Sequence, residues 1–197
     1  MKKRFVGLIL VLLLTIPFSA YAGPPLDTVK GHIDKVLDVL RDSSLKGEPG
    51  KGAKKAKILS ITEKMFDYSE LSRRTLGQNW KKFNNEQQKE FTKLYKSLLE
   101  NAYADKIMTY TDEKVLFSKE NILSEKTCEI QTTIVTKKAD IPIFYRVIQK
   151  EGEWRVYDVV IEGVSLINNY RTQFREILAN KSPDGLLDVL RKKVGKA

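Results

Sequence analysis

The sequence predicts an α+β fold, in which a twisted antiparallel sheet of about four strands packs against helices. Apolar residues recur at helical spacing through the first half of the chain. The segment from about 114 to 161 instead consists of β-branched and aromatic runs joined by short turns. A third observation is the run 154–174, where Gly163 separates a strand-like half from a half with helical periodicity. Helices, then a meander of strands, then helices is an α+β order.

The first 22 residues have the pattern of a secretory signal peptide. A basic Lys2-Lys3-Arg4 triplet precedes an apolar run from Phe5 to Ile16, and Ala20-Tyr21-Ala22 offers small residues to a signal peptidase. The alternative, a retained membrane anchor, is less favoured because the run is shorter than the roughly 20 residues of a span. We expect cleavage after Ala22, one domain over residues 23–197, and a periplasmic location.

Four helices are expected before the sheet. The first covers about 26–45 and ends in the Gly- and Pro-rich segment 46–50, and the second covers about 53–65. Asp67 is the expected cap of a third helix that ends at Leu76. Asn84 and Gln87 form the capping pattern of the longest helix, whose apolar stripe continues to Tyr110.

The sheet and the last helices follow. Strands are expected at about 114–117, 126–137, 141–149 and 154–161, and short turns between them imply antiparallel neighbours. A helix should cover about 164–179, and Ser182 should cap another that starts at Pro183 and ends near Val194. The helical parts are thus about 26–112 and 164–195, and the sheet spans about 114–161.

The third and fourth strands are apolar on both faces over part of their length. Tyr145 and Val147 alternate with Phe144 and Ile148, whereas a sheet with one wet face alternates apolar and polar residues. Both faces are therefore expected to be covered, one by helices and the other by more helices or by a ligand. Periodicity alone leaves open whether a packed core or a bound ligand is the cover.

The composition argues against several classes of function. One cysteine, Cys128, permits no internal disulfide, and one histidine, His32, leaves no Ser-His-Asp or metal-ligating pattern. No phosphate-binding glycine loop is present either. The net charge is +10, but the basic residues are scattered and lack interleaved aromatics, and the export signal also argues against a nucleic-acid partner.

Asp158 is the best candidate for acid-base chemistry because it lies in an apolar strand, where burial raises the pKa of a carboxyl group. A pocket enzyme of the ketosteroid-isomerase type with Asp158 as its base is therefore one alternative. A structural role, in which Asp158 or Glu162 fixes the corner between strand and helix, is the favoured interpretation.

The run Trp154–Ser165, WRVYDVVIEGVS, resembles the signature of the MlaC family, also called toluene-tolerance auxiliary proteins. Further likeness lies in Phe66-Asp67-Tyr68 with Leu76-Gly77-Gln78 and Trp80, in Tyr145-Arg146, and in the closing Asp184-Gly185-Leu186-Leu187. Lys181-Ser182-Pro183 departs from the family pattern at a helix start. The resemblance extends over nearly the whole mature chain.

The resemblance implies a nuclear-transport-factor-like domain with an added helical part that encloses an apolar cavity for phospholipid acyl chains. It also implies a soluble, non-enzymatic carrier without cofactors that maintains outer-membrane lipid asymmetry. The implied partners are an outer-membrane lipoprotein complex of the MlaA type and an inner-membrane ABC transporter with an MCE-domain subunit of the MlaD type. A non-enzymatic adaptor with a filled core is the other alternative.

Combining the resemblance with the apolar patterns gives ten candidate residues for contact with lipid tails. They are Leu94, Leu98, Tyr103, Ile107, Tyr145, Val147, Val156, Val159, Val164 and Ile167. Arg146 and Arg171 are candidates for contact with a head group or a partner protein, with a salt bridge to a carboxylate as the alternative for each. No metal ligands and no catalytic residues are expected.

Overall fold

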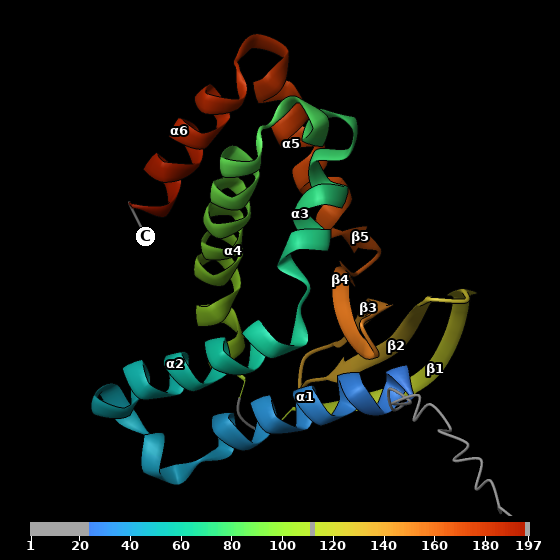
Figure 1. Cartoon of the computed structure of the whole chain (residues 1–197). Helices are drawn as coiled ribbons and strands as arrows, with labels where there is room; N and C mark the ends of the chain where they lie inside the picture. Colours follow the sequence, from blue (N-terminus) through green and yellow to red (C-terminus); the bar gives the residue numbers. More distant parts are fainter. Residues whose placement is uncertain (1–23, 111–112, 196–197) are drawn as a thin grey trace, which may run out of the picture.

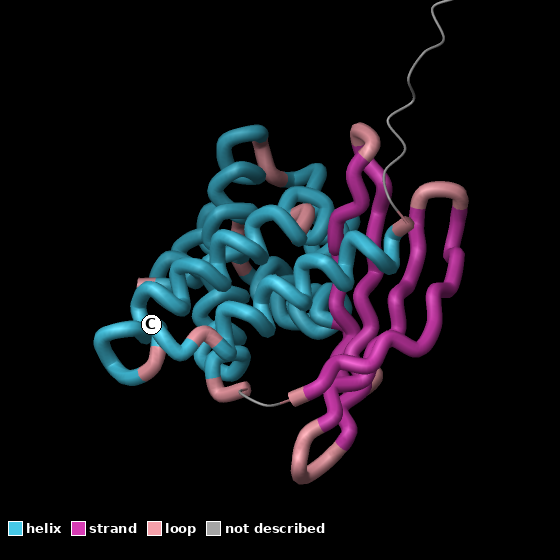
Figure 2. The backbone as a smooth tube through the Cα atoms, turned by 90° about the horizontal axis from the view of Figure 1, so that it is seen from below, coloured by secondary structure: helices cyan, strands magenta, loops and turns pink. Residues whose placement is uncertain are grey.

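A computed structural model describes residues 24–110 and 113–195 (Figure 1). The expected α+β architecture is confirmed: the sheet forms one layer, and most helices gather on one side of it (Figure 2). The expected signal peptide, residues 1–22, lies outside the described residues. Among the helices that are described, none combines the length and the apolar character that a membrane span requires.

The sheet has five antiparallel strands in sequence order. They are β1 (Lys114–Ser124), β2 (Thr127–Val135), β3 (Asp140–Lys150), β4 (Glu153–Ile161) and β5 (Val164–Ser165). The first strand is longer than expected, because it stays paired with β2 as far as Ser124. The other three expected strands agree with the structure to within two residues at each end.

The fifth strand differs from the expectation that a helix starts at Val164. Glu162 and Gly163 have φ values of +48° and +83°, so they form a two-residue turn that folds the chain back onto β4. Val164 then pairs with Ile161, and Ser165 pairs with Val160. The helix begins only at Leu166, where the side chain of Ser165 accepts a hydrogen bond from the backbone N–H of Asn168.

Two helices cross the bottom of the molecule in Figure 1: α1 (Pro25–Arg41) and α2 (Gly47–Met65). A short 3-10 helix, Ser43–Leu45, connects them. The sequence predicted that segment 46–50 would lie between two helices, which is wrong, because α2 already begins at Gly47. Pro49 falls in the first turn of α2, where its missing N–H has no helical partner. A Cβ at Gly50 would lie 2.5 Å from the carbonyl carbon of Leu45, so only glycine fits this close approach.

The remaining helices are α3 (Tyr68–Leu76), α4 (Asn85–Met108), α5 (Leu166–Asn180) and α6 (Pro183–Val194). A 3-10 helix, Gly77–Lys82, precedes α4. The expected caps are confirmed: Asp67 accepts a hydrogen bond from the N–H of Glu70, Asn84 and Gln87 form a reciprocal capping box, and Ser182 caps α6.

Helices α3 to α6 enclose one of two hydrophobic cores. Phe91, Tyr95, Tyr170 and Phe174 lie at its centre, with neighbouring ring centroids 5.2 to 5.7 Å apart. Tilted and edge-on rings at this spacing attract each other. We call this cluster the helical core.

The second core lies between the sheet and helices α1 and α2, and we call it the sheet core. Val29 and Ile33 of α1 pack there against Ile130 and Val147 of the sheet. Strand β4 is covered on both faces, as expected, because Val156 belongs to the sheet core and its neighbour Tyr157 to the helical core. The two cores thus meet across β4.

Candidate functional site

The sheet core is not solid throughout: it contains a cavity of about 370 Å³. The walls come from α1, from the second half of α2, from the C-terminal half of α4, and from the sheet. Their apolar side chains are Ile33, Val36, Leu37, Leu40, Ile58, Leu59, Met65, Phe66, Leu99, Ala104, Ile107, Val115, Ile134, Ile141, Ile143, Val159, Ile161 and Leu166. The volume falls within the range of roughly 300–1,000 Å³ that is usual for small-molecule sites.

Four tyrosines also line the cavity: Tyr68, Tyr103, Tyr110 and Tyr145. Burial raises the pKa of the Tyr145 phenol well above its ordinary value. Burial also raises the pKa of Tyr68 to about 12, although a hydrogen bond with Thr62 opposes the shift. The phenols of Tyr68 and Tyr145 therefore stay neutral at any physiological pH, and their part of the cavity wall carries no charge.

The charged residues of the lining are Glu100, Lys106, Glu113 and Glu162. Lys106 and Glu162 are exposed, whereas Glu100 and Glu113 are partly buried. Burial raises the pKa of Glu100, and Lys96 at 3.8 Å partly offsets this effect. The cavity thus has an apolar interior and a polar rim, an arrangement that suits a ligand with a hydrocarbon part and a wet end.

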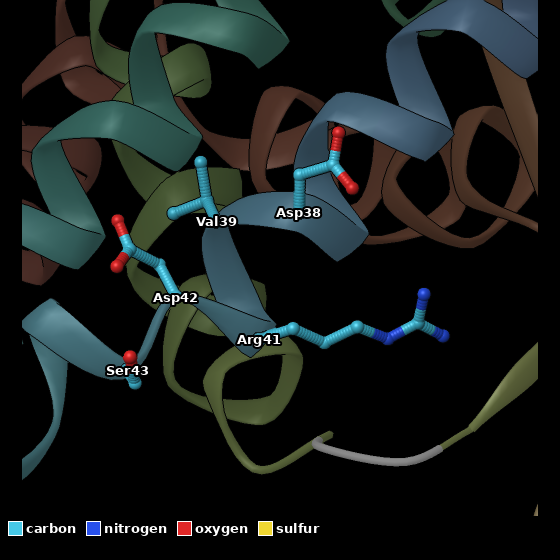
Figure 3. Close-up of a pocket in the computed structure, with 5 residues that line it drawn as sticks. All are labelled: Asp38, Val39, Arg41, Asp42 and Ser43. Carbon is cyan, nitrogen blue, oxygen red and sulfur yellow. The ribbon is translucent and has the colours of Figure 1, made fainter.

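A second hollow lies on the surface at the end of α1 (Figure 3). Its lining residues are Asp38, Val39, Arg41, Asp42 and Ser43, which are mostly polar and come from one short stretch of chain. It is an open depression that encloses nothing, and the Arg41 guanidinium donates a hydrogen bond to the carbonyl of Glu113 at 3.1 Å. We therefore take the enclosed apolar cavity as the candidate site.

Four of the ten residues that the sequence suggested for tail contact line this cavity: Tyr103, Ile107, Tyr145 and Val159. The structure places the other six elsewhere. Leu94, Leu98 and Ile167 belong to or pack against the helical core, Val147 and Val156 lie in the solid part of the sheet core, and Val164 is 58% exposed on β5.

The two candidate arginines are both engaged away from the cavity. Arg146 donates to Glu129 at 3.0 Å and to Asp158 at 3.2 Å. Arg171 donates to the carbonyl of Arg74 at 2.7 Å and to the side chain of Asn168 at 3.3 Å. Arg146 therefore forms the salt bridge to a carboxylate that the sequence left open as the alternative, whereas the partners of Arg171 are a backbone carbonyl and an amide oxygen.

Asp158 is 2% exposed and does not line the cavity. Besides Arg146, its carboxylate accepts hydrogen bonds from the hydroxyl of Ser165 at 2.7 Å and from the N–H of Ile167 at 3.1 Å. It therefore fixes the corner between β4 and α5, as the structural interpretation expected. Within residues 24–110 and 113–195, no three His, Cys, Asp or Glu side chains gather as metal ligands would.

Sequence reasoning missed the contribution of α1 and α2 to the cavity. Ile33, Leu37 and Leu40 recur at helical spacing in the sequence, and this apolar stripe is the signal that α1 covers something. The residues of α2, such as Ile58 and Leu59, gave a weaker signal because the helix starts in a Lys- and Gly-rich segment.

A family model described as MlaC protein matches residues 30–192 of this chain. The chain belongs to the MlaC family. The match begins within α1, ends within α6 and includes all the elements between them. The resemblance that the Trp154–Ser165 run carries is therefore confirmed.

Two curated relatives have related descriptions. The Intermembrane phospholipid transport system binding protein MlaC of Haemophilus influenzae is 29% identical over 119 residues, which are 58% of this chain and 56% of the relative. This alignment thus spans little more than half of that MlaC protein's length. The Toluene tolerance protein ttg2D of Pseudomonas putida is 21% identical over 179 residues, or 89% of this chain and 83% of the relative.

Among solved structures, the phospholipid-binding protein from Ralstonia solanacearum in complex with a phospholipid has the same fold, with a TM-score of 0.78. The two chains are 22% identical, and the superposition covers 88% of this chain and 98% of the other. At this identity the likeness establishes the fold alone. The finer comparison with nuclear transport factor remains a prediction.

Proposed function

We propose that this chain is a periplasmic carrier that binds glycerophospholipid by holding the acyl chains in the cavity of the sheet core. The observation that carries the proposal is the cavity itself, whose interior is lined by aliphatic side chains and neutral tyrosines. Tyr103, Ile107, Tyr145 and Val159 are the proposed tail contacts among the residues that the sequence suggested.

The energetics favour an occupied cavity. An empty apolar space costs about 24 cal/mol per Å³, so 370 Å³ would cost up to about 9 kcal/mol. This cost is comparable to the roughly 5–15 kcal/mol by which a whole domain is stable. A hydrocarbon ligand removes this cost and gains about 0.8 kcal/mol in addition for each methylene that it transfers from water into the cavity.

Membership in the MlaC family supports the partners in this proposal. The relative from Haemophilus influenzae is named as part of an intermembrane phospholipid transport system. We propose that the chain takes or delivers lipid at an outer-membrane complex of the MlaA type and at an MCE-domain subunit of the MlaD type. In this role it maintains the lipid asymmetry of the outer membrane.

The two alternatives are less well supported by the geometry. An adaptor with a filled core would not have a cavity of this size between its sheet and helices. A ketosteroid-isomerase-like enzyme would need Asp158 to face the cavity with a free lone pair. Asp158 instead lies outside the lining and accepts hydrogen bonds from three groups of the chain. We therefore propose a carrier that catalyses no reaction.

Lipid extraction from the purified protein, followed by mass spectrometry, tests this proposal. The expected result is about one phospholipid per chain, together with uptake of phospholipid from vesicles by protein that has been stripped of lipid. The absence of both bound phospholipid and uptake would contradict the proposal.

A further inference from the structure

We propose that Lys106 and Glu162 form the head-group site of this cavity, and that the site prefers a zwitterionic phosphoethanolamine head group over an anionic phosphoglycerol one. This inference rests on the proposed function, since it presumes that the cavity holds phospholipid tails. It assigns the polar contacts to the cavity rim, away from Arg146 and Arg171.

Lys106 and Glu162 line the cavity from two different parts of the fold. Lys106 is near the end of α4 and Glu162 is in the turn between β4 and β5, so they approach the cavity from different elements. They are the two charged lining residues whose side chains are exposed. A head group stays in water while the tails are buried, so its contacts are expected where the lining meets solvent.

The charged groups of Lys106 and Glu162 are both available to a ligand. Within the described residues, neither Lys106 nor Glu162 takes part in a salt bridge. The ammonium group of Lys106 lies 5.7 Å from the ring centroid of Tyr103, which also lines the cavity. Arg146, in contrast, already holds two carboxylates.

A phospholipid head group carries charges that these two side chains can attract or repel. A Lys ammonium group attracts the phosphate that all phospholipids share. A Glu carboxylate attracts the ammonium group of ethanolamine and repels a head group of net negative charge. A cation and an anion that line the same cavity therefore complement a zwitterion, and an exposed charge contact of this kind changes affinity about two- to fivefold.

The chain contains a matched control for Glu162. Glu151 and Gly152, with φ values of +51° and +83°, form the same kind of turn between β3 and β4. Glu151 is likewise exposed, but it lies outside the cavity lining. Replacing either glutamate by glutamine removes one charge from the same backbone conformation, so only their positions differ. Lys93, exposed on α4 and outside the lining, is the control for Lys106.

The test measures which lipid the stripped protein takes from vesicles that contain equal amounts of phosphatidylethanolamine and phosphatidylglycerol with identical acyl chains. The wild-type protein should take up about two- to fivefold more of the ethanolamine lipid. Glu162→Gln should bring this ratio close to one, and Lys106→Gln should lower the uptake of both lipids. Glu151→Gln and Lys93→Gln should behave like the wild type.

The outcomes separate this inference from the carrier proposal. Wild-type uptake with a ratio near one, or a ratio that Glu162→Gln leaves unchanged, would overturn the head-group site and leave the carrier intact. Equal losses in Lys106→Gln and Lys93→Gln would also overturn it, because the effect would then be one of overall charge. No uptake of either lipid by the wild type would overturn the carrier proposal itself.

Discussion

The guanidinium of Arg146 lies 3.2 Å from the carboxylate of Asp158, and the two residues are direct partners across β3 and β4. Glu129, the partner of Arg146 on β2, accepts a second hydrogen bond from it. The three side chains form a charged row across three strands. At its end, Asp158 also accepts hydrogen bonds from Ser165 and Ile167 and so holds the start of α5.

Asp158→Asn is therefore expected to destabilise the protein. An asparagine keeps the shape but loses the charge that Arg146 needs, and whichever way its amide is turned, its NH₂ group faces a donor at a position where Asp158 accepts. We expect a loss of about 1–3 kcal/mol in the free energy of unfolding, measured by urea denaturation. Asp188→Asn is the control, because Asp188 pairs with Arg191 on the exposed surface. Equal stabilities for the Asp158 variant and the wild type would contradict this role.

A charge in the hollow part of the sheet core is expected to act differently from one in the solid part. Val159 lines the cavity, whereas Val147, on the adjacent strand, is 1% exposed and packed on all sides. Val159→Glu should fold but lose phospholipid, because the carboxylate has space and reaches water through the rim. Val147→Glu should fail to fold, since burial of an unpaired charge costs several kcal/mol.

Circular dichroism and lipid extraction on both variants check this contrast. If Val159→Glu unfolds as completely as Val147→Glu does, the space beside Val159 is filled by side chains. That outcome would favour an adaptor with a filled core.

Glu70 predicts a pH dependence of stability. Burial alone would raise its pKa, but hydrogen bonds from Arg73 and Arg74 and the charge of Lys150 outweigh burial and lower the pKa to about 2. The folded-state pKa is thus below the ordinary value of 4.5, so this stabilisation is fully present above pH 4.5 and is lost as the pH falls toward 2. Its size is roughly 3 kcal/mol.

Urea denaturation of Glu70→Gln between pH 7 and pH 3 tests this prediction. The variant should be less stable at pH 7, and its stability should fall less steeply below pH 4.5 than that of the wild type. Glu153→Gln is the control, because Glu153 pairs with Arg155 on the exposed surface. If the free energies of unfolding of the wild type and Glu70→Gln fall in parallel with pH, Glu70 is not the group that causes the pH dependence of stability.

Cys128 is expected to be unreactive in the folded protein. It is 2% exposed in the sheet core, and burial raises the pKa of its thiol to about 11. Since the thiolate is the reactive form, a disulfide reagent at pH 8 should label Cys128 only as fast as the protein opens. Addition of phospholipid should slow the labelling further. Fast labelling of the native protein at the rate of a free thiol would contradict the packing of the sheet core.

The elements that the sequence predicted well are those that local rules determine. The capping box of Asn84 and Gln87 and the Ser182 cap with Pro183 are short patterns whose meaning does not depend on the rest of the fold. Strand β5 was missed because a two-residue strand has no periodicity, and its existence depends on the turn at Glu162 and Gly163.

The cavity was only partly predictable for a related reason. Along α4, Phe91 and Tyr95 enter the helical core, while Tyr103 and Ile107, about two to four turns farther along, line the cavity. All four belong to one apolar stripe, and periodicity does not tell which neighbour covers each part. The same limit applies to Val147 and Val159, which are alike in sequence pattern and differ only in what packs above them.

The central claim is that the space between the sheet and helices α1, α2 and α4 holds hydrocarbon. A crystal structure of the protein as purified tests it most directly. We predict elongated density inside this space, in contact with Tyr103, Ile107, Tyr145 and Val159, that leaves the protein near Lys106 and Glu162. Side chains that close the space completely, with no density other than their own, would contradict the account.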